Sequence, residues 1–378
     1  MSTINSNGTM VFGNTSGGSV TIAPTNNTSA NYTLTIPNVG GSVAMAESIG
    51  RRNYLINGNF DKWDYSTSQT SSGYGSDNRW INASSGSTKT HSQVVCTDTE
   101  RALFNATYFS RTVVSSVAGA SNFTIKYQNI ENVNLLAGKT VTISFWAKAD
   151  STKNIAIAFE QSFGTGGSPS AYVPGIAPQL VALTTTWQKK TITVTLPSIV
   201  GKTLGTDGAQ TTSAAALFWF DAGSINNSRT ASLGQQSGTF DIAQVKIEDG
   251  SIATAGWHPY DGEFGGEIEA CARYYEVGTV QLTGLVYPNG DNRNWMNFIV
   301  IKRVSPTVTL DSTTLSVICA GGGGATNYPL YVNAISTTTN GWRTSTMGNA
   351  NNMNSANGTQ TSSWGNMYHS IYYASAEL

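Results

Sequence analysis

Apolar and polar residues alternate along most of the chain between residues 53 and 262. Three of the clearest segments place their apolar side chains at every second position: Val141, Ile143, Phe145 and Ala147; Ile155, Ile157 and Phe159; and Ile192, Val194 and Leu196. A two-residue period is typical of β-strands that bury one face. Several such strands, joined by loops rich in Gly, Ser and Asn, predict an all-β fold: an antiparallel jelly-roll β-sandwich over residues 51–262.

Two segments of this region depart from simple alternation. The run AAALFWF at 214–220 has apolar residues at both odd and even positions, which predicts a strand buried on both faces. In TFDIAQVKIED at 239–249 the apolar parity shifts from Phe240 and Ile242 to Ala243, Val245 and Ile247. A one-residue shift predicts a β-bulge or a strand that changes sheets.

A helical pattern follows the sandwich. Ile268, Cys271, Ala272 and Tyr275 have the spacing i, i+3, i+4, i+7, which predicts a short connector helix within residues 263–277. Strand-like segments then resume and continue to the end of the chain. Residues 278–378 are therefore predicted to form a smaller C-terminal β-sandwich domain that carries the receptor-binding site.

The first 50 residues have a different composition. They contain one charged side chain, Glu47, and 22 of them are Ser, Thr or Asn. Short apolar alternations, as in SVTIAPT and YTLTIP, predict short strands that bury too little surface to close a core alone. We expect this segment to order against copies of itself or against a partner; an unstructured leader is the alternative.

Charge narrows the possible functions. The chain has 21 Lys and Arg against 22 Asp and Glu, and only 11% of its residues are charged. It lacks the basic excess that phosphate contacts require, which argues against a nucleic-acid-binding function. No apolar run approaches the roughly 20 residues that span a bilayer, and we expect no secretory signal. The three cysteines, Cys96, Cys271 and Cys319, fit neither a disulfide framework nor a zinc site.

No catalytic motif emerges from the spacing of reactive residues. The GKT triplets at Gly138 and Gly201 lack the preceding glycine of a phosphate-binding loop. The three histidines are far apart in sequence. Carboxylate pairs such as Asp61 with Asp64 meet the minimum for glycan cleavage, but Asp is also common in turns. The sequence therefore predicts no enzyme activity, no cofactor and no metal.

Aromatic residues in polar loops indicate sugar binding, because their flat faces stack on pyranose rings. The segment from Gly341 to Asn366 is long, nearly uncharged and bracketed by two tryptophans. The predicted glycan-binding residues are Trp342, Trp364, Tyr368, His369 and Trp80. The alternative is that Trp342 and Trp364 close the core of the C-terminal domain.

Several motifs resemble those of bacteriophage tail fibres and receptor-binding proteins. NYLINGNFDKWDYS at 53–66 resembles the opening strand of their jelly-roll modules. The segment 240–277 resembles the closing strand and the following Cys-x-Arg-Tyr-Tyr signature, here Cys271, Arg273, Tyr274 and Tyr275. RVSPTVTL at 303–310 and YYASAEL at 372–378 resemble the C-terminal domain of these fibres, and residues 20–45 resemble their leader.

The resemblance implies a homotrimeric virion protein that attaches to the phage tail through residues 1–50 and recognises a host surface glycan. It implies neither nucleic-acid binding nor membrane insertion. The module also resembles carbohydrate-binding jelly rolls that hold Ca²⁺. Asp61 matches that pattern, but Ala243 and Gln244 replace the expected acidic pair, so no calcium is predicted. The alternatives are a short tailspike-like glycan depolymerase and a purely structural tail adaptor or decoration protein.

Overall fold

The computed structural model describes parts of the chain in different detail. Backbone and side chains are described over residues 53–207, 211–254, 257, 266–279, 296–311, 335–342 and 371–377. Only the backbone is described for residues 2–4, 10–13, 19–22, 264–265, 280, 283–286, 295, 314–321, 324–332, 343–344, 347–348, 363–368 and 370. Contacts divide the chain into two units, residues 1–44 and 45–378. Within the described ranges, no helix has the length and apolar character needed to cross a bilayer.

The N-terminal unit contains a three-stranded antiparallel sheet. Its strands are β1 (Ser2–Ile4), β2 (Met10–Gly13) and β3 (Ser19–Ile22), in that order. Strand β3 coincides with the predicted SVTI alternation. The second predicted alternation, at 32–37, lies outside the described residues.

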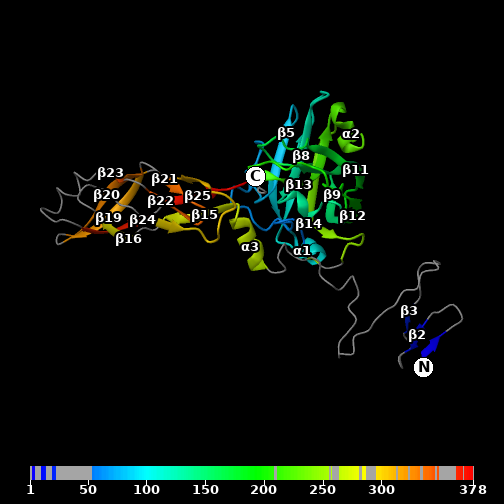
Figure 1. The fold of residues 1–378 in the computed structure, drawn as a ribbon, viewed down its shortest axis with the longest axis horizontal. Helices are drawn as coiled ribbons and strands as arrows, with labels where there is room; N and C mark the ends of the chain where they lie inside the picture. Colours follow the sequence, from blue (N-terminus) through cyan, green and yellow to red (C-terminus); the bar gives the residue numbers. More distant parts are fainter. Residues whose placement is uncertain are drawn as a thin grey trace. The chain divides into compact units, whose positions relative to one another are not determined.

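Two antiparallel sheets form a β-sandwich, which confirms the predicted fold class (Figure 1). One sheet has the order β11-β10-β13-β8-β5, and the other has the order β12-β9-β14-β7-β6-β4. The strands are β4 (Ser68–Gln69), β5 (Ile81–Ser85), β6 (Thr88–Val95), β7 (Tyr108–Ser115), β8 (Phe123–Ile130), β9 (Thr140–Ala149), β10 (Lys153–Ser162), β11 (Val173–Leu183), β12 (Gln188–Thr195), β13 (Ser213–Ala222) and β14 (Gly238–Asp249). Short helical segments are α1 (Asp98–Phe104), η1 (Val133–Leu135), η3 (Ser224–Asn226) and α2 (Asn227–Thr230).

The core lies between the two sheets and follows the predicted alternation. Phe145 of β9, Phe159 of β10 and Phe218 of β13 are fully buried in one apolar cluster. Phe145 and Phe218 meet edge to face, with ring centroids 5.1 Å apart. Burying aromatic rings in this geometry contributes packing energy beyond the area removed from water.

Both irregular strands behave as the sequence predicts. All ten residues of β13 are buried, because its second face also carries an apolar cluster that includes Leu217 and Trp219. In β14 the pairing with β9 shifts register between Ala243 and Lys246, and Gln244 adopts a φ of 52°. This is a β-bulge, and it returns the apolar side chains beyond it to the core.

A charged cluster is buried inside the sandwich. Asp77 forms an ion pair with Lys126 of β8 and a hydrogen bond with His91 of β6, whose Nε2 lies 3.1 Å from Asp77 Oδ1. The other ring nitrogen, His91 Nδ1, lies 3.0 Å from Thr112 Oγ1. Lys126 also donates to Asn82 Oδ1 at 3.1 Å. Buried charges are tolerated when they are paired and hydrogen-bonded, and this cluster meets both conditions.

The connector helix is shorter than predicted. Helix α3 spans Phe264–Ala272, and Tyr275 already begins strand β15. Cys271 nevertheless faces inward as expected: it is buried in a cluster with Ile56 of the sandwich and with Tyr274. The helix ends early because Tyr275 pairs with Ser375 in an antiparallel ladder, which replaces the helical hydrogen bonds.

Three further antiparallel sheets follow the helix, with the orders β15-β25-β18, β16-β24-β19-β20-β23 and β17-β22-β21. Their strands are β15 (Tyr275–Val280), β16 (Thr283–Val286), β17 (Trp295–Asn297), β18 (Thr307–Leu310), β19 (Thr314–Gly321), β20 (Gly324–Val332), β21 (Ile335–Thr337), β22 (Gly341–Thr344), β23 (Met347–Gly348), β24 (Ser363–Tyr368) and β25 (Ser370–Ser375). Contacts place these strands in the same unit as the sandwich, and the domain boundaries inferred from the sequence stay predictions.

The last described residues of the chain are anchored on the sandwich. Arg79 and Glu377 form an ion pair whose side chains are only 1% and 5% exposed. The Arg79 guanidinium also lies 3.4 Å from the ring centroid of Tyr274 and donates to the carbonyl oxygen of Asn129 at 3.0 Å. Beside it, Tyr65 stacks on Tyr275 with centroids 3.5 Å apart. The end of the chain thus closes a buried aromatic and ionic junction.

The junction predicts a large effect of breaking the ion pair. Arg79→Met leaves the Glu377 carboxylate buried without its partner, so the free energy of unfolding should fall by about 3–5 kcal/mol in denaturant titrations. Arg101→Met is the matched control. It removes an exposed pair with Asp98, whose carboxylate side chain is 99% exposed, and should cost about 0.5 kcal/mol or less. Equal losses of unfolding free energy in the two variants would contradict a buried, stabilising ion pair between Arg79 and Glu377.

The buried histidine predicts a pH dependence. Burial, reinforced by the Lys126 charge, lowers the pKa of His91 to about 4. An unfolded His has a pKa near 6.5, so between about pH 6.5 and 4 the unfolded chain binds a proton that the folded chain does not. The His91 contribution to the free energy of unfolding is therefore complete above about pH 6.5. It should fall by roughly 3 kcal/mol as the pH is lowered to about 4. Denaturant titrations of the parent and of His91→Gln should differ in this slope; parallel curves would contradict the assignment.

Candidate functional site

Trp80 is not a glycan-binding residue, contrary to the sequence prediction. Its side chain is fully buried, with the ring packed on Phe60 and Phe218 at centroid distances of 5.2 and 6.2 Å. Its Nε1 donates to the Asn57 carbonyl oxygen at 3.0 Å. The ring has no face left for a ligand, because residues distant in sequence cover it.

Trp342 is also a core residue. It is 1% exposed, and its ring lies 5.4 Å from that of Tyr372. The alternative that Trp342 closes the C-terminal core is therefore the correct one. Trp364 and Tyr368 belong to β24, where only the backbone is described, and His369 lies outside the described residues. Of the five predicted residues, Trp80 and Trp342 are therefore core residues, and the other three remain predictions.

The outer face of the five-stranded sheet offers a different surface. Its cross-strand rows run from β10 through β13 to β8, and small side chains occupy several of the positions. One row is Glu160, Ala215 and Asn129; the next is Ala158, Leu217 and Tyr127. In the first row the small side chain of Ala215 lies between the larger Glu160 and Asn129, and all three residues line a hollow.

A groove of about 270 Å³ follows from this arrangement. Its lining residues come from β8, β10, β13 and the segments that precede β11 and β13: Tyr127, Asn129, Glu160, Ser162, Tyr172, Thr211, Ser213 and Ala215. We call it the outer-sheet groove. It combines two tyrosine rings with an amide, several hydroxyls and one carboxylate.

Glu160 is the charged centre of the groove. Its carboxylate accepts hydrogen bonds from the Tyr172 hydroxyl, from Arg229 of α2 and from the backbone N–H of Gly175. Burial raises the pKa of Glu160, while the hydrogen bond and charge of Arg229 oppose that rise. The ion pair with Arg229 keeps the groove close to electrical neutrality.

Local backbone conformation holds Arg229 against Glu160. The Arg229 guanidinium lies 5.0 Å from the ring centroid of Trp219, which favours a fixed orientation. Gly175 has a φ of 63°, and a Cβ at this position would lie 2.9 Å from the Arg229 Cα. Glycine is required there for both reasons.

The sequence contained weak signals for this groove. The parity of Glu160 follows that of Ala156 and Ala158, opposite to the core residues of the same strand, so its outward position was predictable. No pattern in the loop before β11 distinguishes Tyr172, because its position depends on a hydrogen bond to a neighbouring strand.

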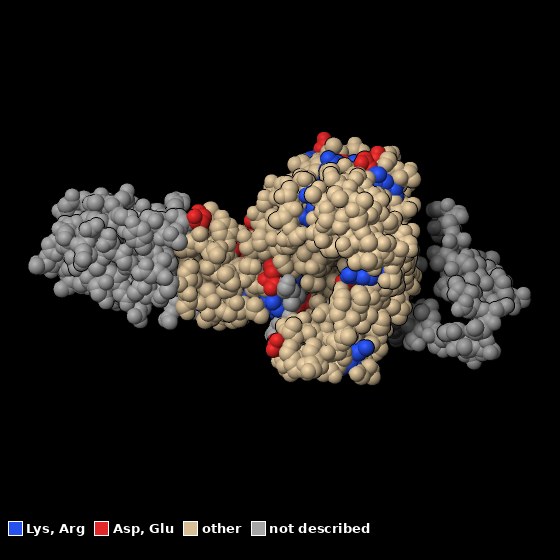
Figure 2. Space-filling model, turned by 90° about the horizontal axis from the view of Figure 1, so that it is seen from above, with Lys and Arg blue, Asp and Glu red and all other residues tan. Residues whose placement is uncertain are grey.

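The described residues contain no group of three or more His, Cys, Asp or Glu side chains arranged to hold an ion. Figure 2 shows one face of the molecule, where charged side chains are scattered and most of the described surface is uncharged. A surface of this kind favours recognition by hydrogen bonds and ring stacking.

Comparisons with known proteins address the fold. No family model matches the sequence, and no curated protein matches it. A structure titled "CBM4 structure and function" is 20% identical and covers 51% of this chain and 98% of its own, with a TM-score of 0.28. A family 11 carbohydrate-binding module from Clostridium thermocellum, in complex with a β-1,3-1,4-mixed-linked tetrasaccharide, is 10% identical, with coverages of 48% and 95% and a TM-score of 0.29.

A phage protein is also similar. The enzymatically active domain of tailspike protein 4 of bacteriophage CBA120 is 15% identical over 52% of this chain, with a TM-score of 0.29. The match spans only 21% of that tailspike chain. At TM-scores near 0.3 these likenesses describe about half of the chain, and its function has to be argued from its own residues.

Proposed function

We propose that this chain binds a glycan in the outer-sheet groove and serves as a phage tail fibre that attaches to the host-cell surface. The observation that carries the glycan part is the combination of Tyr172 and Tyr127 with the amide of Asn129 in one groove. Tyr172 lines the groove and is 48% exposed, so about half of the residue's surface is accessible. Ligand sites of this kind pair apolar ring faces with a few fixed polar groups.

The groove favours a neutral glycan. Its single carboxylate, Glu160, is already engaged by Arg229 and Tyr172. A charged ligand would therefore find no unpaired opposite charge in the groove. Sugar hydroxyls can instead pair with the Asn129 amide and with the Ser162 and Ser213 hydroxyls, which both donate and accept. The hydrogen-bonding pattern therefore fits uncharged pyranose rings.

Binding without cleavage is the version we favour. Glycoside hydrolysis requires two carboxyl groups that flank the scissile bond. The outer-sheet groove has one, and its partners hold it in an ion pair. The depolymerase alternative therefore has less support from the groove than a recognition function.

The tail-fibre part of the proposal rests on the sequence. The Leu-Ile-Asn-Gly-Asn-Phe motif from Leu55 to Phe60 and the Cys-x-Arg-Tyr-Tyr signature that begins at Cys271 both resemble tail-fibre modules. The proposal includes a homotrimer, attachment to the tail through residues 1–50, and location in the virion. Immunogold labelling of particles with an antibody against this chain should mark the tail; unlabelled tails would contradict this part alone.

Substituting the exposed tyrosine tests glycan binding. Tyr172→Ala removes the stacking face. Binding to the neutral oligosaccharide that the parent binds most strongly on a glycan array should therefore weaken about tenfold or more. The melting temperature should stay close to that of the parent, because the ring is half exposed. Tyr172→Phe keeps the ring but loses the hydroxyl that donates to Glu160, and should retain most of the affinity.

Ile225→Ala is the control for this test. Ile225 is 66% exposed and does not line the groove. Its substitution should leave both glycan binding and melting temperature unchanged. If Tyr172→Ala binds as well as Ile225→Ala does, the outer-sheet groove is not the glycan site.

A further inference from the structure

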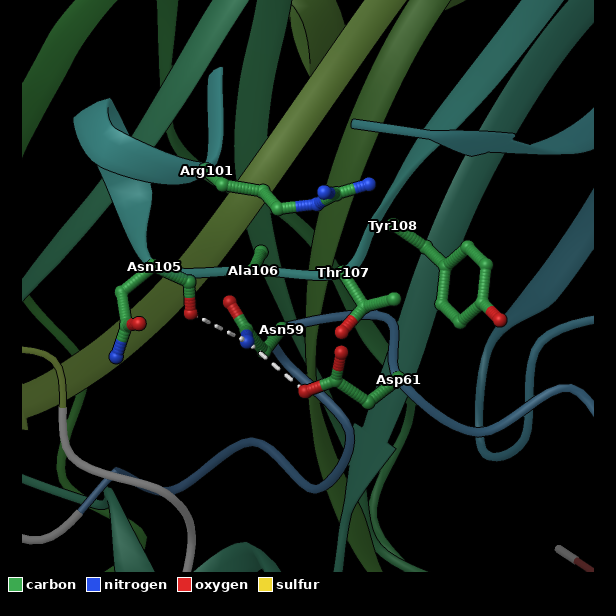
Figure 3. Close-up of a pocket in the computed structure, with 7 residues that line it drawn as sticks. All are labelled: Asn59, Asp61, Arg101, Asn105, Ala106, Thr107 and Tyr108. Atoms are coloured by element: carbon green, nitrogen blue, oxygen red, sulfur yellow. Dashed lines mark hydrogen bonds between the residues drawn. The ribbon is translucent and has the colours of Figure 1, made fainter. Parts of the chain in front are cut away.

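A second cavity lies on the sandwich, where the loop before β4 meets the end of α1 and the start of β7 (Figure 3). Its volume of about 430 Å³ lies within the range of small-molecule sites. The lining residues are Asn59, Asp61, Arg101, Asn105, Ala106, Thr107 and Tyr108. We call it the Asn59 cavity. None of these residues lines the outer-sheet groove.

Asn59 is a largely buried residue of the cavity wall. The residue is only 8% exposed, and its Oδ1 has no hydrogen-bond partner. The amide nitrogen of the same side chain is fully engaged: it donates to Asp61 Oδ2 at 2.9 Å and to the Asn105 carbonyl oxygen at 3.4 Å. These bonds fix the orientation of the amide. Because Oδ1 has almost no accessible surface, a ligand in the cavity does not reach it, and Asn59 instead acts by holding the Asp61 carboxylate in place.

The groups around Asn59 include both acceptors and a donor. The Asp61 carboxylate is held by Asn59 and by the backbone N–H of Thr107, which leaves part of its accepting capacity for a ligand. Figure 3 shows Arg101 extending along one side of the cavity toward Tyr108, with the Thr107 hydroxyl beside Asp61. A guanidinium supplies several N–H donors.

We propose that the Asn59 cavity binds a single neutral sugar residue, whose hydroxyls donate to Asp61 and accept from Arg101. A polyhydroxylated ring provides donors and acceptors together, as this lining requires. A hard cation is the weaker fit. Calcium takes six to eight oxygen ligands, whereas the cavity has one carboxylate and a guanidinium of like charge on its wall.

A second sugar site extends the proposed function without depending on it. A chain with two separate sites can engage two residues of one polysaccharide, which raises the effective concentration for the second contact. Each site can fail on its own. If the outer-sheet groove binds nothing, the Asn59 cavity can still bind a monosaccharide, and the reverse also holds.

Saturation-transfer NMR on the full chain tests the proposal, with D-glucose, D-galactose and N-acetyl-D-glucosamine as separate probes. The parent and Tyr172→Ala should both show transfer to at least one probe, because the Asn59 cavity is intact in both. Asn59→Ala in the Tyr172→Ala background releases the Asp61 carboxylate and should weaken that binding about tenfold or more. Arg101→Met in the same background should also weaken it, and because the Arg101 side chain is 47% exposed this variant keeps its fold.

Asp150→Asn is the control. It removes one carboxylate outside the cavity, at a position whose side chain is 44% exposed, and should leave sugar binding unchanged. The proposal is overturned if no probe binds the parent, if Tyr172→Ala alone abolishes all binding, or if neither Asn59→Ala nor Arg101→Met weakens binding further in the Tyr172→Ala background. Calcium chloride alone provides the last test. If it raises the melting temperature of the parent, and raises it further in Arg101→Met but not in Asp61→Asn, the cavity is a cation site instead.

Discussion

The buried carboxylate of Asp77 imposes the main constraint on the sandwich. It contacts His91 in one sheet and Lys126 in the other, so its charge is satisfied only when both sheets are in place. A charge left unpaired in this interior would cost several kcal/mol, of about the size of total protein stability. Loss of either contact would therefore be costly, and the cluster fixes how the two sheets face each other.

The contact between Asp77 and Lys126 also determines which residues of β8 line the outer-sheet groove. Lys126 must point inward to meet Asp77, so Tyr127 must point outward, because successive side chains of a strand lie on opposite faces. Asn129 follows with the same parity as Tyr127, and its backbone carbonyl accepts from Arg79. The groove, the buried charge cluster and the C-terminal junction thus share strand β8.

Residues 76–80 connect these features over a very short length of chain. Asp77 serves the core, Arg79 pairs with Glu377 at the end of the chain, and Trp80 packs against Phe218. Arg79 adopts a φ of 72°, an uncommon conformation for a residue with a side chain. Its many contacts on the sandwich and the junction compensate for the strained backbone.

Local patterns in the sequence predicted strands β9, β10, β12, β13 and β14 of the sandwich and the bulge in β14, because alternation depends on neighbouring residues alone. They did not predict which tryptophans are exposed. Trp80 lies in a polar loop, yet its partners Asn57 and Phe218 come from elsewhere in the sequence. Helix α3 was placed correctly but ends early, because pairing between Tyr275 and Ser375 involves residues 100 positions apart. Long-range pairing of this kind leaves no local periodicity.

The low charge of the chain has a consequence for recognition. Many of its ionic groups are engaged within the described structure: Asp77 with Lys126, Arg79 with Glu377, and Glu160 with Arg229. Arg111 with Asp241 and Lys302 with Glu276 add two more pairs. Charges paired internally stabilise the fold and leave little net electrostatic field to attract a charged ligand. Selectivity at the two cavities must then come from ring faces and from the directions of hydrogen bonds. Those are features that distinguish neutral sugars, which differ mainly in where their hydroxyls point.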